Sequence, residues 1–508
     1  MGLAARLVQK LVLGNEHMTA SLPPRGGPLA GLKVLELGQL IAGPFAAKTL
    51  ADFGAEVIKI EPPGDAQLGT GGDPLRKWRL LKDGTSVWWQ VQSRNKRSLA
   101  LDLRVAEAQD IVRQLSADAD VVIENFRPGA MEGWGLGPDE LLKRNPRLIV
   151  LRISGYGQTG PYRDRPGFGV VAEAMSGLRH LTAEPGRVPV RVGVSIGDTL
   201  AALHGVIGIL LALQHRHASV SKDAPQGRGQ VIDVALYEAV FNCMESLLPE
   251  YSAFDAVRGP AGSALPGIAP SNAYRCMDNG SAAASAGPPQ ARPAPSGLSA
   301  AAPNLPAQVG TARRADASGI STSSEPRTAG SVGAYVLIAG NGDSIFKRLM
   351  KVIGRDDLAA DPALADNAGR VARVDELDQA IGRWTAQRSV ADVLAALDKA
   401  AVPAGRIYTV ADIAADPHYR ARGMLDSVQM DDGTLLAVPG IVPKLSVTPG
   451  QHRRNAPTLG QDTDAVLREL GLTAAQIQGL KDKGIVSGMT PSAASATASL
   501  PRSKGATP

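Results

Sequence analysis

One aspartate stands where a nucleophilic carboxylate could act. Asp198 follows Gly197 and lies between an apolar, strand-like run and a long apolar run that predicts a helix. A helix N-terminus favours negative charge, so it would keep this carboxylate ionised and able to attack an electrophilic carbon. Aspartate is also a preferred helix N-cap residue, and the two interpretations are compatible. Gly197 would in addition let a substrate approach the backbone closely.

Three other segments suit the binding of a phosphorylated ligand. The glycine-rich segment 153–160 follows a predicted strand, where open α/β sheets bind ligands, although an ordinary turn has the same composition. The segment 93–98 contains three positive charges, which suit either phosphate binding or a solvated turn. In the segment 124–129, Phe126 suits either stacking on a base or packing in the core, and Arg127 could lie near a phosphate.

Metal chemistry lacks its usual patterns in this sequence. His215 and His217 are two residues apart, so they do not share a helix face. Cys243 and Cys276 cannot complete a four-ligand zinc site or a disulfide framework. We therefore expect no metal site, and the low cysteine content favours a reducing, cytoplasmic compartment.

Alternating strands and helices must position these residues. In the first part of the chain, strands are predicted at 32–37, 55–61, 121–123 and 148–153, and helices at 44–53, 105–117 and 138–144. Further along, a helix is predicted from Asp198 to about His215, a strand at 231–234, a helix from Leu236, a strand at 334–339, helices within 376–400, a strand at 442–447 and a helix at 464–470. This alternation predicts a parallel sheet with crossover helices. No G-x-G-x-x-G follows the first strand, which argues against a dinucleotide site.

Composition and charge exclude several classes of protein. The 508 residues are 44% apolar and 20% charged, as in ordinary globular proteins. Residues 281–330 are the exception, because 37 of these 50 are Ala, Gly, Pro, Ser or Thr, which predicts a disordered insert. The net charge of +5 resides in this insert and in the two chain ends, so we expect no nucleic-acid partner.

No membrane span or secretory signal is expected. The longest apolar run, 199–213, is shorter than the ~20 residues that a bilayer requires, so it predicts a buried core helix. The N-terminal segment 1–27 has no clean apolar run of the length a signal peptide needs.

Taken in order, these motifs resemble class III coenzyme A transferases, the family of formyl-CoA transferase and carnitine-CoA transferase. The resemblance covers about residues 28–278 and 332–486. It rests on eight segments in register: 28–35 with 42–44, 54–61, 95–98, 124–129, 155–161, 197–198, 227–230 and 457–461. Each motif alone is weak, but their common order is specific.

The resemblance implies a fold, a site and an assembly. It implies an α/β fold with a Rossmann-like large domain built from both chain ends, a smaller α+β domain, and an interlocked homodimer. Asp198 matches the nucleophilic aspartate of the family. The CoA-binding positions carry over to Ile41, Ala42, Arg97, Leu101, Asp102, Leu103, Arg104, Asn125, Phe126, Arg127, Gly167, Phe168 and Gly169.

The same resemblance suggests domain boundaries. The expected parts are an N-terminal extension at 1–27, the first part of the large CoA-binding domain at 28–225, a linker at 226–262, a small domain at 263–395 that contains the insert 281–330, a return to the large domain at 396–487, and a disordered tail at 488–508.

The implied reaction is transfer of CoA between carboxylic acids. CoA would move from an acyl-CoA donor, expected to be succinyl-CoA, to a small carboxylic or dicarboxylic acid through an aspartyl anhydride and an aspartyl-CoA thioester. CoA and acyl-CoA enter as substrates, so no permanently bound cofactor and no metal are implied. Arg163, Arg165 and Arg191 suit a second carboxylate of the acid, or are ordinary surface arginines.

Some positions depart from the family pattern. Family members often carry an acidic or polar side chain within 166–170, where this chain has Gly169, and the glycine-rich loop at 262–270 retains only Gly262 and Gly267. The insert lies close to that loop in sequence, and we expect it to project into solvent because long surface insertions cost little.

Two other functions were weighed against transfer. An α-methylacyl-CoA racemase needs a His-Asp pair where this chain has Phe168 and Gly169. A non-catalytic CoA-binding protein would have no use for Asp198 in its Gly-Asp context.

Overall fold

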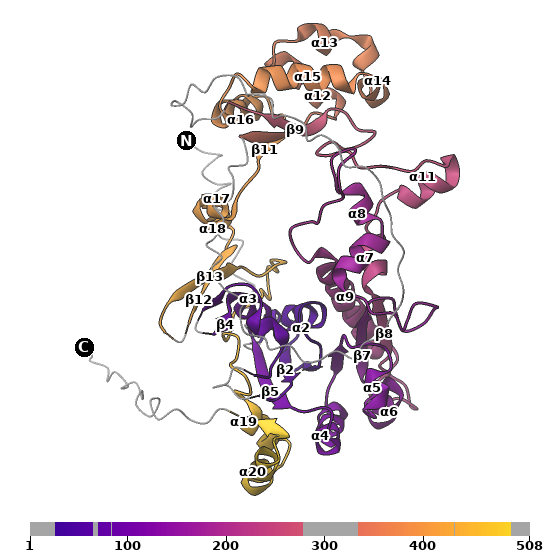
Figure 1. The fold of residues 1–508 in the computed structure, drawn as a ribbon, viewed down its shortest axis with the longest axis vertical. Helices are drawn as coiled ribbons and strands as arrows, with labels where there is room; N and C mark the ends of the chain where they lie inside the picture. The colour runs from indigo at the N-terminus through magenta and orange to yellow at the C-terminus, as the bar shows by residue number, and fades with distance from the viewer. Residues whose placement is uncertain (1–25, 65–69, 83, 278–333, 431, 489–508) are drawn as a thin grey trace, which may run out of the picture. The chain divides into compact units, whose positions relative to one another are not determined.

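The computed structural model describes residues 26–64, 70–82, 84–277, 334–430 and 432–488 (Figure 1). These residues form two compact units, the first from the chain up to 262 together with the chain from 410, and the second from 263 to 409. The chain therefore enters the second unit once and returns to the first. The predicted insert 281–330 lies outside the described residues, as do nearly all of the extension 1–27 and of the tail 488–508.

A seven-stranded sheet forms the centre of the first unit. In sheet order its strands are β14 (Val486–Ser487), β5 (Lys96–Leu101), β2 (Glu56–Glu61), β1 (Lys33–Glu36), β6 (Val121–Glu124), β7 (Ile149–Ser154) and β8 (Val231–Ala235). All neighbours are parallel except β14, which pairs antiparallel with β5. The six parallel strands have the order of doubly wound α/β sheets, with the change of direction between β1 and β6.

Helices cover both faces of this sheet, because the parallel strands are apolar on both sides. One buried core joins the sheet to α2 (Ala42–Asp52), α9 (Ile196–Ala218) and α10 (Leu236–Phe241). The other joins it to α4 (Ala106–Ala117), α6 (Pro138–Arg144), α19 (Thr463–Glu469) and α20 (Ala474–Asp482). The predicted strands and helices up to residue 241 are confirmed, with bounds shifted by one to three residues.

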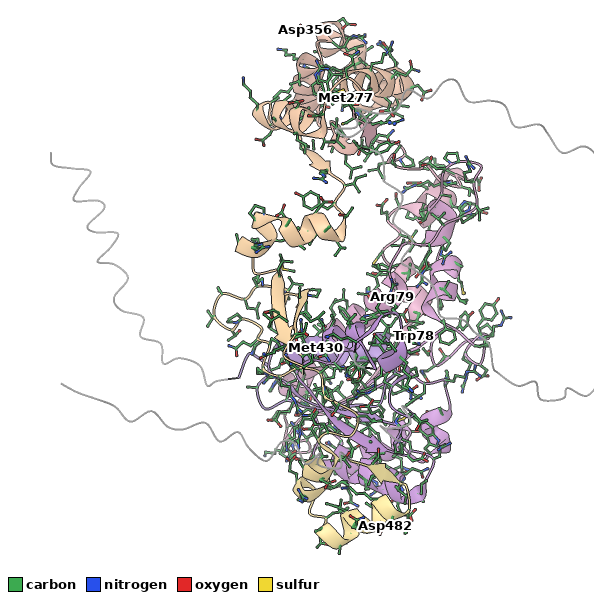
Figure 2. The ribbon with its side chains drawn as sticks, turned by 60° about the vertical axis from the view of Figure 1, so that its left-hand side comes forward. Trp78, Arg79, Met277, Asp356, Met430 and Asp482 are labelled. Atoms are coloured by element: carbon green, nitrogen blue, oxygen red, sulfur yellow. The ribbon has the colours of Figure 1, made fainter. Side chains whose placement is uncertain are left out.

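The remaining elements of the first unit are short. The helices are η1 (Pro74–Lys77), α3 (Val87–Gln92), α5 (Ala130–Gly133), α7 (Gly169–Met175), α8 (Leu178–Leu181), α11 (Leu247–Phe254), α17 (Val410–Ala415) and α18 (Pro417–Ala421). The hairpins are β3 (Leu81–Lys82) with β4 (Thr85–Ser86) and β12 (Leu425–Gln429) with β13 (Leu435–Pro439). Met430, labelled in Figure 2, directly follows β12.

The second unit is a small α+β body. Its antiparallel sheet has the order β11 (Ala404–Arg406), β10 (Tyr335–Ala339), β9 (Ser271–Arg275). Its helices are α12 (Asp343–Val352), α13 (Asp356–Ala360), η2 (Pro362–Leu364), α14 (Asn367–Ala372), α15 (Val374–Thr385) and α16 (Val390–Lys399), and they share one apolar core with the sheet. Strands β9 and β10 are neighbours in this sheet, and Arg275 at the end of β9 is the register partner of Tyr335 at the start of β10.

One predicted strand of the C-terminal part is wrong. The segment 442–447 is not a strand, although it is rich in valine and leucine. Val442, Leu445 and Val447 are exposed, so this apolar pattern does not bury a strand face. The predicted helix at 464–470 is confirmed as α19, and α20 and β14, which were not predicted, follow it and complete the edge of the sheet.

The long helix α9 also differs from its prediction. It has 23 residues and is the one helix within the described residues that is long and apolar enough to cross a membrane by length and composition, with 39% of the relevant window buried. It packs against β7 and β8, so it is part of the core, yet Leu203, Ile207, Leu210 and Leu211 are exposed. The prediction of a buried core helix is therefore right for one face only, and the expected cytoplasmic location stays a prediction.

Candidate active site

The topology of the sheet places Asp198 at its carboxyl edge. Helix α9 lies in the crossover from β7 to β8, and Figure 1 shows it beside these two strands and α7. A crossover helix runs antiparallel to the strands that it connects, so the N-terminus of α9 lies at the edge where the strands end. Ligands of open α/β sheets bind at this edge.

Asp198 is not the N-cap of its helix. Helix α9 begins at Ile196 and its N-cap is Ser195, so Asp198 is the third helical residue. The N-cap role that the sequence also suggested therefore belongs to Ser195, while the Asp198 carboxylate accepts a hydrogen bond from its own backbone N–H in the first turn.

The carboxylate of Asp198 rests on the backbone of Gly169. A Cβ atom added to Gly169 would lie 2.1 Å from Oδ2 of Asp198 and 2.9 Å from its Cγ, closer than real Cβ atoms approach. Gly169 is the first residue of α7, and a Cβ on Gly155, just after β7, would lie 2.8 Å from the Cα of Gly167. The glycines therefore let this loop close tightly over the end of β7 and bring α7 against Asp198.

Burial makes Asp198 a weaker acid than an ordinary aspartate. Burial raises the pKa of Asp198 to about 6, and the nearby charge of Glu173 adds to this rise. A hydrogen bond from the backbone N–H of Asp198 itself and the charge of Arg191 oppose it. The sequence-based expectation that the helix N-terminus keeps the carboxylate ionised stays a prediction, because burial raises the pKa without making the group neutral at pH 7. At pH 7 about nine-tenths of the side chain remains ionised.

We expect a pH profile that follows this ionisation. A nucleophilic carboxylate must be deprotonated, so kcat/KM for the acyl-CoA should be constant above pH 7 and fall about tenfold for each unit below pH 6. Initial rates between pH 4.5 and 8.5, with thermal melts to verify folding at each pH, measure this limb. A midpoint near 4 would show that the carboxylate keeps its ordinary pKa.

The loop after β1 is held rigidly at the same edge. The backbone N–H of Gln39 donates to Oδ1 of Asn125 at 2.7 Å, and the Asn125 amide donates back to the carbonyl of Gln39 at 2.9 Å. The N–H of Leu40, a residue with φ of +63°, donates to Asp73 at 3.0 Å. A left-handed leucine costs of order 1–3 kcal/mol and persists because these contacts determine it.

A buried ionic network supports this loop from below. Lys59 and Lys96 lie 3.0 and 2.7 Å from the Glu36 carboxylate, and Lys59 also lies 2.8 Å from Asp73. The Lys59 ammonium group also donates to the carbonyl of Gly38, and the Lys96 ammonium group donates to the carbonyl of Pro44. Burial opposes ionisation of Asp73, but Lys59 holds the pKa of that carboxyl below its usual value. The network therefore fixes both ends of the segment that contains Ile41 and Ala42, whose side chains are buried.

Two further turns carry predicted CoA-binding residues to this edge. Leu101 ends β5, and the exposed Arg104 pairs with Asp102 at 2.8 Å in the turn that continues to Leu103. The turn after β6 holds Asn125, which clamps the β1 loop, and Phe126, whose ring meets Trp134 edge to face at 5.1 Å. Phe126 therefore packs against the core with a half-buried side chain, as one of its two interpretations predicts. Arg127 is exposed.

Arg97 lies at the opposite edge of the sheet from the other predicted CoA-binding residues. It is the second residue of β5 and pairs with Glu469 through two hydrogen bonds of 2.7 Å. With Lys33 and Glu56, the first residues of β1 and β2, it lines a cavity at the opposite edge of the sheet. The structure therefore does not bring Arg97 together with the other predicted CoA-binding residues.

The basic segment 93–98 is neither a solvated turn nor a phosphate site. Lys96 begins the buried strand β5, and Arg94 binds the Asp52 carboxylate at 2.7 Å with 1% of its surface exposed. Buried charges require partners, and acidic residues distant in sequence provide them.

At the remaining predicted positions, Gly167 lies against Gly155, and Phe168 is 65% exposed beside Gly169. Predicted CoA-binding residues from three loops and the nucleophile candidate thus share one edge of the sheet.

Sequence reasoning missed two features of the site. Glu173, on α7, is fully buried beside Asp198, and its carboxylate accepts from Arg179 at 3.2 Å. An acidic residue four positions after Gly169 gave no signal of this. A Gly-x-Ser-x-Gly pattern at 193–197 was also passed over, but Ser195 follows no strand, which a nucleophile elbow requires.

Comparison with known proteins decides which family uses this arrangement. The model of CoA-transferase family III matches residues 29–318 and 327–463. The chain belongs to CoA-transferase family III. The match is interrupted at 319–326, inside the segment that composition sets apart.

Relatives of this family III enzyme cover nearly all of it. It is 39% identical over 471 residues to succinyl-CoA–D-citramalate CoA-transferase of Chloroflexus aurantiacus, covering 92% of this chain and 100% of the relative. It is 37% identical to the beta subunit of succinyl-CoA–L-malate CoA-transferase of the same organism, covering 90% of this chain and 98% of the relative. A CAIB/BAIF family protein from Brucella suis has a TM-score of 0.66 at 32% identity, covering 88% of this chain and 100% of that one. The predicted family and enzyme class are confirmed.

Proposed function

We propose that this CoA-transferase moves CoA from succinyl-CoA to a short dicarboxylic acid through covalent intermediates on Asp198. The observation that carries the proposal is the position of Asp198, whose carboxylate lies at the carboxyl edge of the sheet against the bare backbone of Gly169. The two Chloroflexus relatives are named for succinyl-CoA and for D-citramalate or L-malate, which are dicarboxylic acids.

The first half-reaction transfers CoA to the enzyme. A carboxylate oxygen of Asp198 attacks the thioester carbonyl carbon, the carbon–sulfur bond breaks, and CoA leaves as the thiolate with a mixed anhydride left on the enzyme. The thiolate then attacks the Asp198 acyl carbon, the anhydride carbon–oxygen bond breaks, and succinate leaves. Asp198 now carries CoA as a thioester, and no net proton is taken up.

The second half-reaction reverses these steps with another acid. The acceptor carboxylate attacks the Asp198 thioester carbon and releases CoA thiolate. The thiolate then attacks the acceptor carbon of the new anhydride, which gives the product acyl-CoA and frees the Asp198 carboxylate. The N-cap Ser195 makes no side-chain hydrogen bond to the helix, so backbone N–H groups at the start of α9 are candidates to stabilise the oxyanions.

CoA is proposed to lie along the carboxyl edge. The loop containing Ile41 and Ala42, the turn at 101–104 and the turn at 125–127 supply backbone groups there, and the exposed Arg104 and Arg127 suit its phosphates. Because Arg97 lies at the other edge of the sheet, we do not include it in this site. We retain Gly167 and Phe168 for the thioester end, beside Gly169.

A screen for new acyl-CoA products tests the proposal. Purified protein, succinyl-CoA and a panel of monocarboxylic and dicarboxylic acids are incubated, and acyl-CoA masses are read together with released succinate. We expect a new acyl-CoA in equal amount to succinate with at least one dicarboxylic acid. Absence of every new mass, also with acetyl-CoA as donor, would favour the non-catalytic alternative. Epimerisation of a 2-methylacyl-CoA without transfer would favour the racemase alternative, which Phe168 disfavours because phenylalanine transfers no proton.

We also propose that two copies assemble, as the sequence resemblance suggests. The exposed side chains Leu203, Ile207, Leu210 and Leu211 recur at helical spacing along α9, and α11 adds Leu248, Tyr251 and Phe254. Exposed apolar side chains that recur along a helix face are typical of subunit interfaces. Light scattering should give the mass of two chains, and a mass of one chain would exclude the assembly.

A further inference from the structure

Three charged residues beside the nucleophile have no part in the proposed steps. Glu173 has no exposed surface, and its Oε1 accepts no hydrogen bond from any described residue. Arg179 approaches Oε2 of Glu173 at 3.2 Å, and Arg191 approaches Oε1 at 3.9 Å. This group sits at the start of α9, since Arg191 also contacts Oγ of the N-cap Ser195 at 3.4 Å.

The two arginines differ in what they can still bind. Arg179 is 22% exposed and is engaged with Glu173. Arg191 is 47% exposed, and its contacts with the described residues are a long ion pair and one marginal hydrogen bond. A guanidinium has five N–H donors, and two of them suit a carboxylate held in a bidentate manner. Arg191 therefore keeps donors free for an anion beside Asp198, while Glu173 limits where its guanidinium can go.

We propose that Arg191, held by Glu173, binds the unreactive carboxylate of a dicarboxylic acid while the other carboxylate reacts at Asp198. This inference rests on the proposed function and adds the residue that selects dicarboxylates. The nearness of the two sites is supported by the contacts of Arg191 with Glu173 at 3.9 Å and with Ser195, three residues before Asp198, at 3.4 Å.

The net charge of Glu173, Asp198, Arg179 and Arg191 favours binding of the dicarboxylate acceptor after CoA has been attached to Asp198. In the free enzyme the charges of Glu173 and Asp198 offset those of Arg179 and Arg191. Once Asp198 carries CoA as a thioester it is neutral, so the cluster holds one net positive charge. The dicarboxylate acceptor is thus attracted to the covalent enzyme, the form with which it must react.

Matched acids and matched variants test this role. Glutarate and valerate differ by a carboxylate in place of a methyl group, and Arg191→Gln, Arg191→Lys and the control Arg187→Gln are compared with the wild type. Arg187 is exposed and lies on the same loop. In a two-step mechanism with a covalent intermediate, kcat/KM for the acceptor reports the second half-reaction alone. Assays run at pH 8, where Asp198 stays ionised even without Arg191.

The expected pattern is a selective loss. Arg191→Gln should lower kcat/KM for glutarate about 10- to 100-fold, the value of a charge-assisted hydrogen bond, and change it for valerate less than about threefold. Arg191→Lys should recover part of the loss, and Arg187→Gln should change neither acid. An equal loss for both acids, or none for glutarate, would overturn the proposal. Equal use of both acids by the wild type would overturn it too, and would leave the transferase function standing.

Discussion

Replacing Asp198 with asparagine should lower CoA transfer at least about 10³-fold, because the substitution removes the only group to which CoA is proposed to become attached. Binding of CoA should persist, since the predicted CoA-binding loops keep their own hydrogen bonds. The measurement is the rate of acyl-CoA formation by mass spectrometry, with Asp139→Asn on the exposed first turn of α6 as a matched control.

The same variant should be at least as stable as the wild type. The pKa of Asp198 is raised from 3.8 to about 6, so the folded protein binds this proton more tightly than the unfolded chain does. Stability from this group is therefore highest below pH 4 and is lost as the pH rises through 6, by up to about 3 kcal/mol. Asparagine avoids that loss, so its thermal midpoint should match or exceed that of the wild type at pH 7. A strongly lowered midpoint would mean that lost activity reports misfolding.

Trapping the intermediate separates this mechanism from others. Hydroxylamine attacks anhydrides and thioesters of carboxylates, so wild-type enzyme incubated with succinyl-CoA and hydroxylamine should lose activity and carry a hydroxamate on the peptide containing Asp198. Hydroxylamine without succinyl-CoA should leave the enzyme active. A modified residue other than Asp198 would contradict the assignment.

Replacing Gly169 with alanine should lower kcat/KM about 100-fold or more. The added methyl carbon would lie 2.1 Å from Oδ2 of Asp198, so the carboxylate or the start of α7 must shift. Displacement of a reacting group by about 1 Å can cost a factor of this size. The measurement is steady-state kinetics at pH 8 with succinyl-CoA as donor and the acceptor found in the screen.

A second glycine provides the control for that substitution. Gly479 lies inside α20, and a Cβ there would meet nothing within 4 Å. Gly479→Ala should keep full activity and gain up to about 1 kcal/mol of stability, the helix propensity difference. Full activity in Gly169→Ala would show that the carboxylate can move without loss, and that its contact with the glycine backbone does not fix the reactive geometry.

Much of the fold could be predicted because its strands are locally apolar. The segments at 121–123 and 148–153 consist almost entirely of apolar residues that are buried on both faces of a parallel sheet, so they stand out in the sequence. The strand β5 could not be recognised in the same way. It begins with Lys96 and Arg97, and two charged residues at the start of a segment favour the prediction of a turn. Their acidic partners, Glu36 and Glu469, are distant in sequence, so the local sequence does not reveal them.

The 442–447 segment shows the opposite error. Its apolar residues have the composition of a strand, but no neighbouring strand pairs with them, and Val442 and Val447 stay exposed. Strand formation depends on hydrogen bonds to another segment, which local composition does not contain.

The sequence by itself determined the family, the order of the motifs and the identity of Asp198 as the candidate nucleophile. The tertiary structure decided the environment of that carboxylate: its contact with Gly169, the buried Glu173 and the half-free Arg191 beside it, and the raised pKa. It also separated Arg97 from the other predicted CoA-binding residues. The physical reason is that burial and electrostatic interaction depend on distance in space. The loop after β7 and the start of α9 come together only in the folded chain, at the carboxyl edge of the sheet.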